Sequence, residues 1–100
     1  MARKVTREQD FEAVLLSGHK QDAVELPFDP ALAWDSRPVA IRPGRRGHRV
    51  AGTVNGVPFD SWVVSRQKRH YVLVEEPVRA KAGIAAGDRV HVVLAPAGAP

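Results

Sequence analysis

Residues 50–64 read VAGTVNGVPFDSWVV, and the pattern around Asn55-Gly56 predicts the fold of this chain. Alternating residues flank the pair on both sides, with Val50, Gly52 and Val54 on one face of the first segment. A type I′ turn needs positive φ at both central residues, which Asn-Gly tolerates well. Period-two alternation is typical of a strand with one buried face. We therefore expect a tight hairpin, with strands over 50–54 and 59–64.

Similar alternation predicts four further strands on either side of this hairpin. Turn-forming residues separate them, including Ser17-Gly18 and Gly87-Asp88. Pro27 has no N–H to donate and should end the second ladder. The expected strands cover residues 11–16, 24–28, 70–74 and 90–94.

Two short helices are expected, because each candidate begins at an acidic residue followed by proline. Asp29-Pro30 can cap a helix over residues 30–34, and Glu76-Pro77 can open one that stops at Gly83. Prolines interrupt residues 35–47, which we expect to form a basic loop with Val39 to Ile41 as a brief extended piece.

The fold class is therefore mainly β, and short strands with regularly spaced turns favour a closed or partly closed barrel. One hundred residues suit a single core. The expected organisation is a flexible N-terminus (1–9), one β-barrel domain (10–95) that includes the 35–47 basic loop, and a flexible tail (96–100).

Composition excludes several kinds of protein. The chain has no cysteine, which rules out disulfides, thiolate zinc sites and a cysteine nucleophile. No apolar run approaches the ~20 residues of a membrane span, and no apolar stretch follows the basic start, so we expect a cytoplasmic protein. The net charge of +4 favours anionic partners, although charge runs are usually solvated loops.

Several motifs together resemble a known family. They are Phe11-Glu12-Ala13, Val24 to Asp29 (VELPFD), Gly52 to Phe59 (GTVNGVPF), Val78-Arg79 to Ala82-Gly83, and Gly87 to Val90 (GDRV). Their order and spacing are similar to those of the bacterial family called domain of unknown function 1905, over about residues 10–95. The resemblance implies a small six-stranded double-split β-barrel, similar to the swapped-hairpin barrels of transition-state regulators and antitoxins. It implies no activity.

Two segments depart from the family pattern, and both add positive charge in predicted loops. Asp35 to Gly47 is longer than the usual short link and carries Arg42, Arg45 and Arg46. Ser65 to His70 replaces a turn that usually holds Gly and Met. Loops often carry function, so the change indicates either specialisation or simple drift.

Catalytic and metal-binding motifs are missing from the pattern. The four histidines are scattered, no HExxH occurs, and neither a nucleophile elbow nor a glycine-rich phosphate loop is present. We predict no catalytic residue, no metal site and no cofactor, and we leave open whether the protein is an enzyme.

The favoured function is a non-catalytic binding module for an anionic or aromatic small molecule or a protein partner. An exposed Trp62 beside the basic turn would form such a surface. A Trp62 that instead plugs the barrel or packs under the Trp34 helix would not. The predicted ligand-binding residues are Trp34, Trp62, Arg66, Lys68 and His70.

Three further hypotheses stay open at this stage. Nucleic acid could bind through Arg42, Arg45, Arg46 and Arg49. A small cyclase or isomerase could use the neighbourhood of Asp60, Trp62, His70 and Tyr71. Residues 11–16 are apolar on both faces, so a second copy could cover one face in a homodimer.

Overall fold

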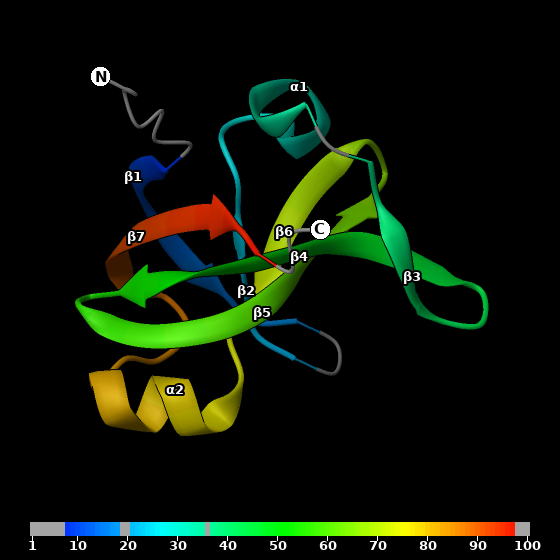
Figure 1. Cartoon of the computed structure of the whole chain (residues 1–100). Helices are drawn as coiled ribbons and strands as arrows, with labels where there is room; N and C mark the ends of the chain where they lie inside the picture. The colour runs from blue at the N-terminus through cyan, green and yellow to red at the C-terminus, as the bar shows by residue number, and fades with distance from the viewer. Residues whose placement is uncertain (1–7, 19–20, 36, 98–100) are drawn as a thin grey trace, which may run out of the picture.

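Seven antiparallel strands form one sheet in the computed structural model, which describes residues 8–18, 21–35 and 37–97 (Figure 1). Their order is β3-β4-β5-β6-β2-β1-β7, and a further pairing of β4 with β7 closes six of them into a barrel. The strands are β1 (Gln9–Leu16), β2 (Ala23–Glu25), β3 (Val39–Arg42), β4 (Arg45–Val54), β5 (Val57–Arg66), β6 (Arg69–Leu73) and β7 (Arg89–Pro96).

The Asn55-Gly56 hairpin is confirmed. Asn55 and Gly56 have φ values of 48° and 83°, and they join β4 to β5. The ladder runs from the Val54–Val57 pair to the His48–Val63 pair without a bulge. The sequence motif thus sets the register in which the barrel is built.

Both predicted helices are present on opposite sides of the barrel: α1 (Pro30–Trp34) and α2 (Glu76–Ala82) (Figure 1). Asp29 caps α1, with its Oδ1 atom accepting a hydrogen bond of 2.9 Å from the Ala31 N–H. Gly83 ends α2 in the left-handed conformation. The predicted fold class, a mainly β closed six-stranded barrel with two short helices, is confirmed.

The expected basic loop over residues 35–47 is largely a β-hairpin instead. β3 pairs with the first part of β4, and Pro43-Gly44 forms the turn between them. Gly44 adopts a φ of 78°, which an L-residue with a side chain rarely takes. The prolines therefore punctuate an edge strand rather than prevent one, and the hairpin projects beyond the barrel (Figure 1).

The two predicted flexible ends lie only partly within the described residues. Residues 1–7 and 98–100 fall outside them. Gln9 already pairs with Leu94, and Pro96 pairs with Val50. The ordered barrel therefore begins before residue 10 and extends past residue 95.

Branched aliphatic side chains fill the barrel, and an aromatic group closes one side of it. Trp34 is 1% exposed and packs edge-on against Phe28, with ring centroids 5.3 Å apart. Phe28 in turn packs against Phe11 at 5.9 Å. The buried core comprises Leu15, Val24, Leu26, Trp34, Val50, Val54, Phe59, Val63, Val72, Val74, Val90, Val92 and Leu94.

Gly52 allows β4 and β7 to approach closely. A Cβ atom at this position would overlap the carbonyl group of Val93 on β7.

Since the β4–β7 pairing closes the barrel, we expect Gly52→Ala to lower the free energy of unfolding by about 3 kcal/mol or more. Urea denaturation measures this change. Thr53→Ala is the neighbouring control and should cost about 1 kcal/mol or less; equal costs for the two variants would contradict the steric argument.

Candidate ligand-binding site

A hollow lies where the β4–β5 ladder splits. The last paired residues of the two strands are His48 and Val63. Beyond them β4 pairs with β3 and β5 pairs with β6, so the strands form two separate hairpin arms. The cavity beside this split, here called the split hollow, has a volume of about 410 Å³ and is lined by Leu16, Ser17, Gly18, Gln21, Ala23, Arg45, Val64, Arg66, Tyr71 and Leu73.

The floor of the split hollow is apolar because of strand register. Val64 lies opposite Tyr71 on β6, and Leu73 lies opposite Ala23 on β2. Alternate residues of a strand share a face, so these side chains gather on one outer surface of the barrel. Small-molecule sites are typically about 300–1,000 Å³, mostly apolar, with a few polar groups. The volume of the split hollow lies in that range, and its lining combines apolar side chains with polar and charged ones.

Two arginines border this apolar floor, one on each arm. Arg45 comes from β4 and Arg66 from β5, and both side chains are exposed. Within residues 8–18, 21–35 and 37–97, no carboxylate forms an ion pair with either. By contrast, Arg69 pairs with Glu25 at 3.2 Å, Arg79 with Asp22 at 3.3 Å, and Arg89 with Glu12 at 3.0 Å. The split hollow thus has positive charge available for an anion.

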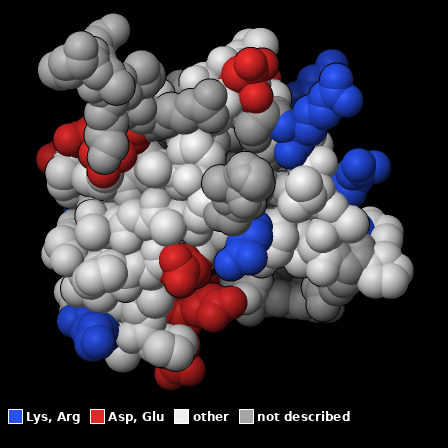
Figure 2. All heavy atoms as spheres, in the orientation of Figure 1, with Lys and Arg blue, Asp and Glu red and all other residues white. Residues whose placement is uncertain are grey.

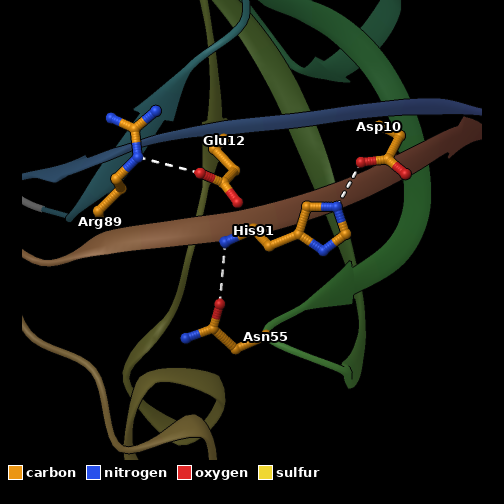
Figure 3. Close-up of polar contacts among 5 residues, drawn as sticks. All are labelled: Asp10, Glu12, Asn55, Arg89 and His91. Carbon is orange, nitrogen blue, oxygen red and sulfur yellow. Dashed lines mark hydrogen bonds and ion pairs between the residues drawn. The ribbon is translucent and has the colours of Figure 1, made fainter.

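On the β1–β7 face, charged and polar side chains pair with one another (Figure 3). Glu12 accepts from the Arg89 Nε atom at 3.0 Å, and Asp10 contacts the His91 Nε2 atom. Asn55 Oδ1 accepts from the His91 backbone N–H at 2.8 Å. Because these groups use their hydrogen-bonding and charged atoms on one another, they are better explained as structural contacts than as a ligand site.

Of the five predicted ligand-binding residues, Arg66 alone lines the split hollow. Trp62 shares its face, since the two lie four residues apart on β5, but the Arg49 guanidinium lies 5.7 Å from its ring centroid. Trp62 therefore contacts Arg49 and does not line the hollow. Lys68 lies in the β5–β6 turn, with a φ of 69° and an exposed side chain. Trp34 is a core residue, so it has no surface to offer a ligand.

His70 faces away from the split hollow, because its neighbour Tyr71 faces into it. Its Nδ1 atom lies 3.0 Å from the Ser65 hydroxyl, and its Nε2 atom lies 3.8 Å from Asp29 Oδ1. His48 belongs to the same cluster and is 6% exposed. Burial, followed by the charge of His70, lowers the pKa of His48, while Asp29 acts in the opposite direction.

The enzyme neighbourhood expected from the sequence does not converge on one cavity. Tyr71 lines the split hollow, whereas His70 contacts Ser65 and Asp29 on the opposite face. Asp60 is exposed on β5, outside the residues that line the hollow. These side chains therefore do not line one common cavity that could hold a substrate.

The arginines proposed for nucleic acid lie on both sides of β4. Arg45 and Arg49 are four residues apart and share one side of the strand, whereas Arg46 projects to the other side. Arg49 lies against Trp62. The structure does not describe the side chain of Arg42. On the face shown in Figure 2, basic side chains lie mainly on the β3–β4 side and acidic ones on the other half.

Sequence reasoning missed Tyr71, Leu73 and the β1–β2 end as parts of one ligand site. The missing signal was the length of the β5–β6 turn, which is only Gln67-Lys68, both with positive φ. A two-residue turn places Arg66 opposite Arg69 and Val64 opposite Tyr71. The strands expected from the sequence left a five-residue turn over residues 65–69, and a turn of that length does not specify those pairs.

Comparison with known families gives one match. A family model described as "Domain of unknown function (DUF1905)" matches residues 11–94. The chain belongs to this family. The match spans every strand of the closed barrel, and the resemblance inferred from the GTVNGVPF motif is confirmed.

Membership of the DUF1905 family identifies neither a ligand nor a reaction for this protein. A comparison with curated proteins finds no match. In the described part of this DUF1905 chain, no group of three or more His, Asp or Glu residues is suited to a metal ion. No described helix is both long enough and apolar enough to cross a membrane. The split hollow therefore has to be judged by its own chemistry.

The buried His48 predicts that this DUF1905 protein loses stability in acid. Unfolded His48 takes up a proton near its ordinary pKa of 6.5, whereas the folded protein holds that pKa lower. The unfolded state then binds more protons, so the free energy of unfolding should fall as pH drops below 6.5 until it passes the folded pKa. Urea denaturation between pH 7.5 and 5 measures the decrease.

His48→Gln should show a smaller decrease than the parent protein over this pH range. His91→Gln removes an exposed histidine instead and should keep at least the parent decrease. An undiminished decrease in His48→Gln would show that the acid sensitivity comes from other groups.

Proposed function

We propose that this protein is a non-catalytic binding module for a small anionic molecule with an apolar or aromatic body. One observation carries the proposal: Arg45 and Arg66 border an apolar hollow of about 410 Å³ without a carboxylate partner among the described residues. An anion there would receive charge-assisted hydrogen bonds, while its body covers Val64, Tyr71 and Leu73. A purely polar ion would leave that apolar floor unused.

The alternatives have less support. Arg46 projects to the opposite side of β4 from Arg45 and Arg49, and Arg49 lies over the Trp62 ring, so few of these arginines face a nucleic-acid backbone together. A homodimer stays a prediction; Val14 and Leu16 on β1 are 41% and 40% exposed, which is compatible with it. The cytoplasmic location that the sequence analysis expects also stays a prediction.

The proposal is tested with 8-anilinonaphthalene-1-sulfonate, an aromatic anion whose fluorescence rises in apolar surroundings. We expect saturable binding to the folded protein, and about a tenfold loss of affinity in Arg66→Gln. A charge-assisted hydrogen bond contributes about 1.5–3 kcal/mol, and tenfold corresponds to about 1.4 kcal/mol.

Arg89→Gln is the matched control, since it removes the same charge from an exposed arginine that does not line the hollow. It should bind the probe like the parent protein. Circular dichroism confirms that each variant is folded. Equal losses in the two variants, or no saturable binding at all, would refute the proposed site.

A further inference from the structure

Each arm of the split ends in a pair of arginines. In the β3–β4 arm, Arg42 is in register with Arg45. In the β5–β6 arm, Arg66 is in register with Arg69. Like charges directly opposite each other in a sheet are destabilising. The β5–β6 arm carries this cost immediately beside the split hollow.

Only part of that positive charge is neutralised within the described residues. Both carboxylate oxygens of Glu25 lie 3.2 Å from Arg69 Nη1, so this arginine has its counterion. Arg45 and Arg66 have no such partner in the described ranges. The rim of the hollow therefore offers two guanidinium groups, one from each arm, to whatever occupies it.

Neutral hydrogen-bonding groups line the opposite rim. Ser17 and Gln21, between β1 and β2, border the same cavity as the two arginines. A hydroxyl and a side-chain amide can each donate to an oxygen atom without adding charge. An anionic group in the hollow thus meets charged donors on one side and neutral donors on the other.

We infer that the split hollow takes a phosphate monoester, with its phosphate between Arg45 and Arg66 and its body over the apolar floor. The inference rests on the proposed function and specifies the ligand class. A monoester phosphate carries about −1.5 to −2 charges at pH 7 and has three acceptor oxygens. It therefore matches two guanidinium groups, whereas a carboxylate neutralises one.

A small molecule fits this site better than a phosphodiester polymer. A cavity of about 410 Å³ matches a single small ligand. Each diester phosphate also brings only about one negative charge. The phosphate chemistry is common to both sources, so the experiment includes both.

Isothermal titration calorimetry at pH 7.5 with phenyl phosphate and benzoate tests the inference. The two ligands share a ring and differ in charge and oxygen count. We expect phenyl phosphate to bind at least tenfold more tightly than benzoate. In Arg45→Gln and in Arg66→Gln that preference should shrink to threefold or less, while Arg89→Gln should keep it.

The possible outcomes separate the two proposals. Equal affinity for phenyl phosphate and benzoate in the parent protein overturns the phosphate inference and leaves the proposed function standing. No binding of either ligand, together with no binding of the anilinonaphthalene probe, overturns both. A ten-nucleotide single strand of thymidine that binds more tightly than phenyl phosphate also overturns the inference, in favour of a nucleic-acid backbone.

Discussion

Barrel closure depends on the hydrogen bonds that β4 makes to three other strands. Its C-terminal half pairs with β5 on one edge and with β7 on the other, which joins the two ends of the six-stranded sheet. Its N-terminal part pairs with β3 instead. β3 pairs only with residues of β4 that precede the barrel ladders, and the β3–β4 hairpin projects beyond the barrel (Figure 1). Gly52 makes the close approach to β7 possible.

The split hollow lies where the β3–β4 and β5–β6 arms part. When β4 turns toward β3 and β5 continues toward β6, the space between the arms is left to side chains rather than backbone. Apolar residues cover its floor, and Arg45 and Arg66 border it. The charge of the cavity thus comes from residues near the ends of the two arms.

Alternation and turn chemistry predicted the strands, both helices and the Asn-Gly hairpin, because these depend on local sequence. They failed for residues 35–47, where four arginines and two prolines obscured an edge strand that is stabilised by pairing with β4. The sequence also could not show which side chains point toward the core. Whether Trp34 or His70 faces the core follows from α1 packing and from the two-residue β5–β6 turn, neither of which is encoded in the period of the strand itself.

The wall between the hollow and the interior is a single layer of β-sheet. Val64, Arg66 and Tyr71 face the hollow, while their neighbours Ser65 and His70 point to the other face of the sheet, where His70 contacts both Ser65 and Asp29. Substitutions at these outward positions can therefore change the charge and shape of the hollow while the contacts on the other face of the sheet stay in place.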